Sequence, residues 1–424
     1  MTSVEITILG SGREVGRAAI LVSGKGEKPL LLDYGVNFDE EDLPVFPGHV
    51  RPRDIEAVAI THSHLDHVGA APSLFVSTVP QLIATPVTIE VSRLLLYDFI
   101  KLNGANLPFD NYAVDTLVKT GTRLGFNEEV KVGSYGVNLV DSGHIPGSSA
   151  IYVDVGGRKV LYTGDLNNIE TRLVGPHKLG GLKVDTLIIE STYGDSNHPP
   201  RSLTEDRFTR AVREVVEAGG TVLVPAFSVS RGQELMMLLA ENECGGPVYI
   251  DGMIREVALI YHNYSEYIRR HDLLDSAVRD YVIVNGWRDR RKASKKPGVI
   301  IASAGMLKGG PSLYYFKKMA DNEANGVFLV SYQAPGTPGR EILETGRYAE
   351  EDIEVKARLE WFDFSSHIDQ NGIIEAVKGL EGLKRVVLVH GEYKVQKALE
   401  ERLVEEAGVE EIIIPENGDT LTFG

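Results

Sequence analysis

The sequence contains a single cysteine, Cys244, in 424 residues. One cysteine excludes a disulfide within the chain and is typical of proteins from a reducing compartment. No apolar run approaches the roughly 20 residues that span a bilayer. The first residues, Val4 to Leu9, alternate like a strand and lack the basic and apolar regions of a signal peptide. We therefore expect a soluble, cytoplasmic protein with no membrane contact.

Positive charge is also scarce, with 44 Lys and Arg against 60 Asp and Glu, a formal charge of −16. Such a chain cannot attract a polyanion by its net charge, so any contact with nucleic acid must be local. One basic run stands out at 288–296, with six positive charges and one negative. A solvated loop and a phosphate-contacting segment are about equally expected for a run of this kind.

Internal repeats, low-complexity segments and a long Pro/Ser-rich linker are all missing from the sequence. The length exceeds what one hydrophobic core usually supports, so two domains packed against each other are expected. Up to about residue 190, short β-branched runs ended by polar residues or glycine predict a sheet-rich α/β domain. These runs are Leu30 to Leu32, Val137 to Val140, Lys159 to Tyr162 and Thr186 to Ile189.

The pattern of apolar and polar residues changes at about Asp195, where longer helical patterns begin to alternate with strand patterns. Such alternation is typical of βαβ units and a largely parallel sheet. The expected helices are Thr204 to Ala218 and Gly232 to Asn242, and the expected strands Thr221 to Val224, Val248 to Ile250, Val299 to Ala302 and Val327 to Val330. After Gly346 the sequence returns to the short strand-like runs of the first part, in Val355 to Phe362, Val386 to Val389 and Ile412 to Ile414. We predict that 195–346 is inserted into a domain formed by 1–194 and 347–424.

The glycine-rich segment 10–16 imitates a dinucleotide-binding fingerprint. The residues that follow it, Ala18 to Val22, have a strand pattern. Dinucleotide binding needs a helix N-terminus at that point for the pyrophosphate. We therefore interpret the segment as a glycine-rich hairpin.

Three histidines and one aspartate lie within six residues, directly after the apolar run Ala57 to Ile60. In an extended segment, alternate side chains share a face, so His62 and His64 point the same way, and a following turn can bring Asp66 and His67 to a neighbouring point. Imidazole and carboxylate are ligands that zinc prefers, and an open nitrogen/oxygen site is typical of catalytic zinc. The motif predicts two adjacent metals and metal-assisted hydrolysis.

Further ligand candidates follow other predicted strands, namely His144, Asp165 and His390. Each alone could be a turn residue or a helix cap, but their repeated position after a strand favours a common site. Glu190 ends one strand and His367 follows an aromatic segment; an acid beside a histidine would orient it as a proton donor. Asp33 is a candidate hydrogen-bond acceptor for a ligating imidazole, although a plain strand-end aspartate fits its spacing equally well.

Taken in order, these residues resemble the metallo-β-lactamase fold, a four-layer αββα sandwich. Glu190, His367 and His390 are similar to the three additional motifs of its β-CASP branch, whose members process nucleic acids. The segments 10–17, 225–234 and 303–307 resemble RNA-cleaving members, most closely the nuclease subunit of the cleavage and polyadenylation specificity factor and its short archaeal and bacterial relatives. The KH domains of longer archaeal relatives are not expected here. The likeness covers nearly the whole chain.

The resemblance implies a catalytic dinuclear zinc centre and a substrate of single-stranded RNA. One zinc is expected on His62, His64 and His144, the second on Asp66, His67 and His390, and Asp165 between them. A metal-bridging hydroxide would attack phosphorus, and His367, oriented by Glu190, would protonate the departing 3′ oxygen; Asp66 is counted with them as catalytic. The matching segments and the basic run suggest RNA contacts at Ser228, Arg231, Ser303, Gly305, Arg290 and Arg291.

Alternatives to this ribonuclease hypothesis remain open from the sequence. A small-molecule metallohydrolase could use the same metal site, although it has no evident need for the insertion, Glu190 and His367. An RNA-processing subunit with little activity of its own would have the same residues. Endonuclease and 5′ exonuclease action are not distinguished, RNA is favoured over DNA only by the resemblance, and a homodimer is expected only by analogy.

Overall fold

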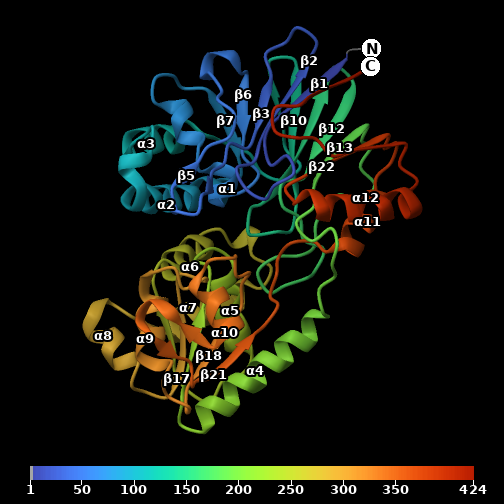
Figure 1. The fold of residues 1–424 in the computed structure, drawn as a ribbon. Coiled ribbons are helices and arrows are strands. Elements are labelled where there is room, and N and C mark those ends of the chain that lie inside the picture. Colours follow the sequence, from blue (N-terminus) through green and yellow to red (C-terminus); the bar gives the residue numbers. More distant parts are fainter. Residues whose placement is uncertain (1–2) are drawn as a thin grey trace. The chain divides into compact units, whose positions relative to one another are not determined.

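The computed structural model describes residues 3–424 and divides the chain into two compact units. Unit 1 comprises the residues up to Ile169, Pro176–Asn197 and Ser366–Gly424, and unit 2 comprises Glu170–Gly175 and His198–Ser365. Figure 1 shows that each unit has its own sheets and its own covering helices. Among residues 3–424, no helix is both long and apolar enough to cross a membrane.

Unit 1 is built on two seven-stranded sheets. The first has the order β24-β1-β2-β3-β6-β7-β8 and the second the order β23-β22-β13-β12-β11-β10-β9. The strands of the first sheet are β1 (Val4–Gly10), β2 (Ala19–Gly24), β3 (Leu30–Leu32), β6 (Ala57–Ala59), β7 (Gln81–Ala84), β8 (Thr122–Arg123) and β24 (Thr420–Phe423). Those of the second are β9 (Glu129–Val132), β10 (Tyr135–Asp141), β11 (Ser149–Val155), β12 (Arg158–Tyr162), β13 (Thr186–Glu190), β22 (Arg385–Val389) and β23 (Glu411–Ile413).

The helices of unit 1 cover the outer faces of these sheets, which gives the expected four-layer αββα sandwich. Strand alternation divides the apolar side chains: Ala57 and Ala59 of β6 face the core between the sheets, whereas Val58 faces the helices. Isoleucines of α11 pack on Leu187 in the other outer core. The helices are α1 (Leu65–Val68), α2 (Pro86–Asn103), α3 (Asn111–Thr120), α11 (Gln370–Lys378) and α12 (Tyr393–Ala407), and a small hairpin, β4 (Asn37–Phe38) and β5 (Pro44–Val45), lies outside the main sheets.

Local sequence sets the ends of these helices. The side chain of Thr85 accepts a hydrogen bond from the backbone N–H of Thr88 and so caps α2. Pro86 follows at the first helical position, where proline is favoured because a backbone N–H there would have no partner within the helix. Asp369 caps α11 in the same way, through the backbone N–H of Gly372. The helix α12 ends at Gly408, whose φ of 63° lies in the left-handed region that glycine adopts without strain.

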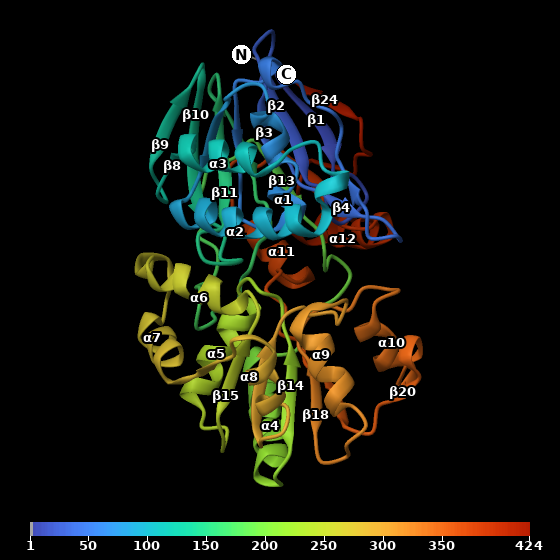
Figure 2. The same cartoon turned by 90° about the vertical axis from the view of Figure 1, so that its left-hand side faces the viewer.

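Unit 2 holds a six-stranded parallel sheet of the order β16-β15-β17-β14-β18-β21. The central strands are buried along their whole length, as expected for a parallel sheet that is covered on both faces. Figure 2 shows helices on both sides of it. The strands are β14 (Thr221–Pro225), β15 (Val248–Asp251), β16 (Val282–Ile283), β17 (Gly298–Ala302), β18 (Gly326–Leu329) and β21 (Arg358–Trp361), and a hairpin is formed by β19 (Arg347–Tyr348) and β20 (Ile353–Glu354). The helices are α4 (Arg201–Glu217), α5 (Arg231–Glu241), α6 (Ile254–His262), α7 (His271–Asp280), α8 (Gly286–Ala293), α9 (Gly310–Met319) and α10 (Pro338–Thr345).

The boundaries of the insertion differ from those predicted at 195 and 346. Residues 347–365 belong to unit 2, because β21 pairs with β18 along its full length. Glu170–Gly175 also belongs to unit 2, because Arg172 forms ion pairs with Glu205 and Glu241. The chain therefore returns to unit 1 at Ser366, one residue before His367.

Candidate metal centre

The histidine motif lies in the loop that leaves β6. His62 and His64 follow the strand, and the single turn of α1 then brings Asp66 and His67 back beside them. The loop is held closely: a Cβ on Gly35 would lie 1.7 Å from the backbone oxygen of Asp66, so only glycine fits there. The glycine-rich segment 10–16 is followed by the strand β2, as predicted. The segment lies beside the site, because the backbone oxygen of Ser11 accepts a hydrogen bond of 2.8 Å from the backbone N–H of His390.

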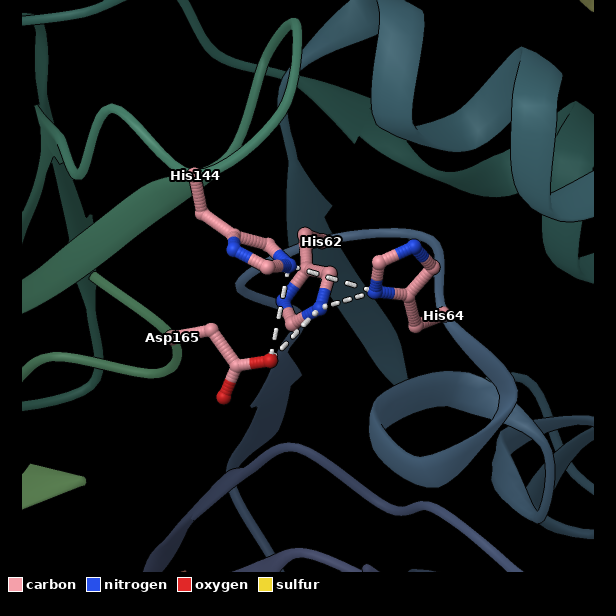
Figure 3. Close-up of side chains that lie close together, drawn as sticks. All are labelled: His62, His64, His144 and Asp165. Atoms are coloured by element: carbon pink, nitrogen blue, oxygen red, sulfur yellow. Dashed lines mark hydrogen bonds and ion pairs between the residues drawn. The ribbon is translucent and has the colours of Figure 1, made fainter. Parts of the chain in front are cut away.

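The first ligand group consists of His62, His64, His144 and Asp165, whose side chains converge on one point (Figure 3). Nδ1 of His64 lies 3.0 Å from Nε2 of His62 and 3.3 Å from Nε2 of His144. Oδ2 of Asp165 lies 3.5 Å from each of these two Nε2 atoms. All four side chains come from the ends of strands or from the loops after them.

The second group consists of Asp66, His67 and His390. Oδ2 of Asp66 lies 3.3 Å from Nε2 of His390 and 3.8 Å from Nε2 of His67. Asp165 reaches this group as well, with Oδ1 at 3.3 Å from Nε2 of His67. The two oxygens of Asp165 thus face different groups, one each.

These distances fit cations. Two ligand atoms that each lie about 2.0–2.1 Å from one zinc in tetrahedral geometry are about 3.4 Å apart. Nε2 of His67 and Oδ1 of Asp165 are buried and make no hydrogen bond among residues 3–424. A buried polar atom without a partner costs free energy, which a bound metal would remove. The donor set of imidazole and carboxylate suits zinc.

Hydrogen bonds outside the two groups orient the imidazoles. Nδ1 of His67 donates to Asp33 over 2.7 Å, and Nδ1 of His144 donates to the backbone oxygen of Ser366 over 2.9 Å. When these rings are neutral, Nε2 is the unprotonated nitrogen and faces the site. Asp33 is fully buried and also accepts bonds from Thr61 and Tyr162. It has the position that was predicted for a partner of a ligating imidazole.

Electrostatics keeps most of the first group neutral. Burial lowers the pKa of His62 and of His144 well below the usual range, and that of His64 to about 4. Although burial opposes its charge, Asp165 has a lowered pKa because of His67 and His390 around it. Neutral imidazoles beside an ionised carboxylate are the state in which these groups bind a metal.

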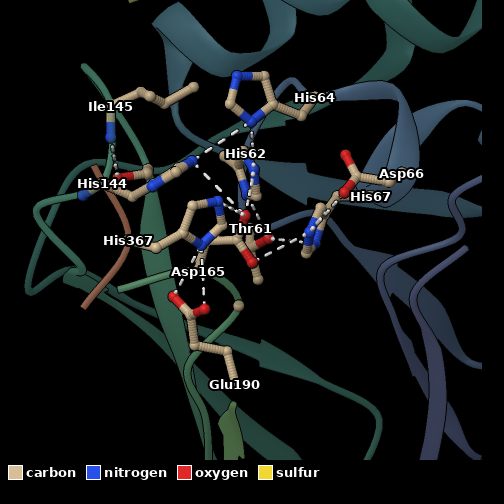
Figure 4. A network of polar contacts seen from close by, with 12 residues as sticks. Thr61, His62, His64, Asp66, His67, His144, Ile145, Asp165, Glu190 and His367 are labelled. Atoms are coloured by element: carbon tan, nitrogen blue, oxygen red, sulfur yellow. Dashed lines mark hydrogen bonds and ion pairs between the residues drawn. The ribbon is translucent and has the colours of Figure 1, made fainter. Parts of the chain in front are cut away.

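Glu190 and His367 meet at the edge of the two groups (Figure 4). Nδ1 of His367 lies 3.0 Å from Oε2 of Glu190, whose side chain is fully buried at the end of β13. Nε2 of the same ring lies 3.8 Å from Oδ2 of Asp165. Although burial disfavours the charged ring, Glu190 and then Asp165 raise the pKa of His367 to about 9. The ring is 24% exposed, so it can reach a bound molecule.

Several residues of this centre were not anticipated. Thr61 accepts a bond of 3.0 Å from the ring of His62 and donates to Asp33. Thr192 lies 3.2 Å from Nδ1 of His390. Thr61 is adjacent to the motif and could have been singled out on that ground, whereas the sequence carries no signal for the contact of Thr192.

Four of the predicted RNA contacts lie together in unit 2. Ser228 and Arg231 follow β14, and Ser303 and Gly305 follow β17, the strand that pairs with β14 in parallel. The carboxyl edge of a parallel sheet is where ligands commonly bind. Arg231 is almost wholly buried at the first position of α5.

The two RNA contacts predicted in the basic run, Arg290 and Arg291, have different surroundings in the structure. Arg290 donates two hydrogen bonds to buried Asp251, of 2.8 and 3.0 Å, so its guanidinium is engaged within unit 2. Arg291 is exposed. We therefore no longer expect Arg290 to contact phosphate.

Comparisons with known proteins agree with this architecture. Residues 13–225 match the model of the metallo-β-lactamase superfamily, 232–342 that of the Beta-Casp domain, and 352–415 that of the Zn-dependent metallo-hydrolase RNA specificity domain. A crystal structure of a protein of unknown function from Enterococcus faecalis V583 is similar over 99% of this chain and 100% of that one, with a TM-score of 0.65 and 16% identity, a likeness of fold alone.

Three curated relatives are similar over most of the chain. RNase aCSPSF2 of Saccharolobus solfataricus is 46% identical over 99% of this chain and 85% of that protein. Probable RNase MJ4 of Methanocaldococcus jannaschii is 35% identical, covering 92% and 93%. Transcription termination factor FttA of Pyrococcus horikoshii is 34% identical, covering 92% and 66%. The chain therefore belongs to the β-CASP family of the metallo-β-lactamase superfamily.

Proposed function

We propose that this protein is a zinc-dependent ribonuclease that hydrolyses phosphodiester bonds of single-stranded RNA. The observation that carries the proposal is the position of His367, whose ring joins Glu190 on one side and faces the two ligand groups on the other. A hydrolase needs a proton donor at the leaving group as well as an activated water, and this centre offers a place for each. The names of the relatives, two of them RNases, support RNA as the substrate.

Two zinc ions are proposed per chain, one on the group of His62, His64 and His144 and one on the group of Asp66, His67 and His390, with Asp165 shared. Bound zinc lowers the pKa of water from about 15.7 to about 7 and offsets charge on the phosphoryl oxygens. The protein holds the ligands in place through the hydrogen bonds to Asp33, Thr61 and Ser366.

His367 is the proposed acid. Water first releases one proton to the solvent; as its oxygen then forms a bond to phosphorus, the bond from phosphorus to the 3′ oxygen breaks, and Nε2 of His367 delivers a proton to that oxygen. His367 afterwards regains a proton from the solvent. The products are a 5′-phosphate and a 3′-hydroxyl. Glu190 is a positioning residue, because its contact with Nδ1 fixes the ring and favours the protonated form.

RNA phosphates are proposed to bind in unit 2 at the carboxyl edge of β14 and β17. Ser228 and Ser303 offer hydroxyl groups there, Gly305 permits a close approach of backbone, and Arg231 supplies positive charge. Backbone N–H and hydroxyl groups at such an edge recognise phosphate without reading the base.

The test is cleavage of RNA labelled at its 5′ end by the zinc-loaded protein, beside a matched DNA strand and a H62A/H64A variant. Labelled fragments of intermediate length, absent with the variant, indicate an endonuclease, whereas release of labelled mononucleotide alone indicates a 5′ exonuclease. Cleavage of DNA alone would contradict RNA as the substrate. No cleavage of either strand by a protein with two zinc ions would overturn the proposal of a self-sufficient nuclease.

Two further features remain proposals. A homodimer is proposed by analogy with the family, and the molar mass from light scattering in solution tests it. A cytoplasmic location is supported by the single cysteine and is tested by fractionation of the source cells.

A further inference from the structure

The helix α8 of unit 2 carries an exposed tryptophan beside unpaired positive charges. Trp287, one of only two tryptophans in the chain, is 61% exposed. An exposed tryptophan ring gives up the free energy that its burial would provide and leaves a large aromatic surface open to a ligand. Figures 1 and 2 show α8 next to α9.

The ring of Trp287 is held in place. It makes an edge contact with Tyr314 of α9, with ring centres 5.3 Å apart and planes at 77°, and the guanidinium of Arg290 lies 5.2 Å from its centre. Arg290 is itself fixed by two hydrogen bonds to Asp251, which is 2% exposed. Trp287 is therefore a rigid aromatic surface that loses little conformational entropy when a ligand stacks on it.

A row of positive charges runs along the same helix. Arg288, Arg291, Lys292 and Lys295 are spaced by three, four and seven residues from the first, so they share one face of α8 and of the turn that extends it. All four are exposed, and of them only Lys292 has an ion-pair partner among residues 3–424, Asp289 at 3.7 Å. We call these four residues the α8 stripe.

The chain as a whole carries a formal charge of −16, so four positive charges on one face of a helix are a local feature. Most exposed arginines of unit 2 elsewhere have acidic partners, as Arg340 has Glu344 and Arg347 has Asp352. A helix needs only mixed charges for solubility, so four like charges on one face add repulsion without a structural benefit. A ligand with several negative charges would relieve that repulsion.

We propose that α8 is a second binding site for single-stranded RNA, in which successive phosphates contact the α8 stripe and an unpaired base stacks on Trp287. A positive groove or face combined with an aromatic platform is how proteins bind single strands without sequence preference. A duplex would offer the phosphates but no open base, so the site favours unpaired RNA. The inference rests on the proposed function, and it predicts that long RNAs bind better than short ones.

The test compares RNA binding by variants made in the zinc-loaded, 424-residue H367A protein, which is expected to bind RNA and to cut it slowly enough for binding to be measured first. Fluorescence anisotropy gives the dissociation constant of a labelled RNA of about 30 nucleotides. The measurement is repeated at KCl concentrations from about 50 to about 200 mM, because the affinity that phosphate contacts provide falls steeply over this range. Neutralising the stripe, as R288Q/R291Q/K292Q/K295Q, should weaken binding at least about tenfold at 100 mM and reduce the slope of log K against log salt by about 3. Replacing Trp287 with Ala should weaken binding about fivefold or more and leave that slope unchanged.

A matched control removes four other exposed arginines of unit 2, as R210Q/R213Q/R340Q/R347Q, and changes the net charge equally. We expect its dissociation constant to stay within about twofold of the parent, since the effect is local. In a W361F background, Trp287 is the sole tryptophan, and single-stranded RNA should quench its fluorescence more strongly than duplex RNA of the same length.

The outcomes separate this inference from the proposed function. If the parent binds RNA and the stripe and Trp287 variants bind it equally well, the α8 site is wrong while the nuclease proposal stands. Equal loss in the control variant would also overturn it, because net charge alone would then explain the effect. If the parent binds no RNA even at 50 mM salt, the proposed function itself fails.

Discussion

The imidazole ring of His367 lies between two carboxylates: its Nδ1 is 3.0 Å from Oε2 of Glu190, and its Nε2 is 3.8 Å from Oδ2 of Asp165. Glu190 is in turn fixed, because its Oε1 accepts a bond of 2.6 Å from the backbone of Leu166. A buried acid therefore holds a partly exposed ring against the ligand groups. The proposed roles of binding metal and of moving a proton therefore fall on different residues, and the two can be tested apart.

Replacing His367 with Ala should slow cleavage about 10²- to 10⁴-fold, the usual contribution of a general acid. The zinc content should stay at the wild-type value, because the His367 ring belongs to neither ligand group. Single-turnover cleavage and metal analysis of the same samples measure both effects. Substitution of the exposed His49 with Ala serves as the control, and loss of zinc from the H367A protein would contradict the assigned role.

Glu190 and His367 should act as one unit. We expect E190Q to slow cleavage at least about tenfold, because the ring loses the contact that orients it, and the E190Q/H367A double variant to be no slower than H367A alone. A double-mutant cycle on kcat measures this coupling. Independent effects that multiply in the double variant would mean that Glu190 acts through another residue.

The two ligand groups should lose metal separately. H144A removes a ligand of the first group and H390A one of the second, so each protein should retain about one zinc fewer than wild type, whereas D165A should weaken both sites. Metal analysis after dialysis gives the counts, and the thermal midpoint should fall with each lost ion because the metal binds only the folded state. A zinc content that H390A leaves unchanged would refute the second group.

Asp33 should control metal affinity without touching metal. It accepts hydrogen bonds from His67, Thr61 and Tyr162. Asparagine in its place would direct the N–H groups of its amide at some of these donors, so that those hydrogen bonds are lost. We expect D33N to bind zinc about 10- to 100-fold more weakly. Competition with a chromogenic chelator measures the affinity. Asp185→Asn, at a strand end elsewhere in unit 1, is the control and should bind zinc as wild type does.

The stability of unit 2 should depend on pH through Asp363. Burial opposes its charge, but the hydrogen bond from His198, of 2.8 Å, together with the backbone N–H of Ser365, lowers its pKa below the usual 3.8. A lowered folded-state pKa adds stability that is present above about pH 3.8 and is lost as the pH falls through the folded value. D363N should therefore reduce the free energy of unfolding by about 1.5–3 kcal/mol at pH 7.

Urea unfolding of wild type and D363N at pH 7 and at successively lower pH checks the sign. The difference between the two proteins should shrink once the pH drops below about 3.8. A difference that grows on acidification would mean that the charged carboxylate destabilises the fold.

The convergence of the candidate ligands was predictable because their chemistry is concentrated in the sequence. Four of them follow one strand between Thr61 and His67, and each later candidate follows another strand. The parallel sheet of unit 2 agrees with the alternation of helical and strand patterns, and the αββα sandwich agrees with the resemblance to the metallo-β-lactamase fold. The return to unit 1 was misplaced, because the residues of β21 have the same local pattern whichever sheet they join, and only pairing with β18 decides it. The partner of Arg290 was equally hidden, since Asp251 lies 39 residues away in sequence.

The order of the ligands along the chain has a consequence for synthesis of the protein. Six of the candidate ligands precede unit 2, namely His62, His64, Asp66, His67, His144 and Asp165, whereas His367 and His390 follow it. A growing chain on the ribosome can thus bring the first ligand group together before unit 2 is made, whereas the proposed proton donor and the candidate ligand His390 are added only after unit 2. With the roles proposed for His367 and His390, the nascent chain gains activity only once unit 2 has been synthesised.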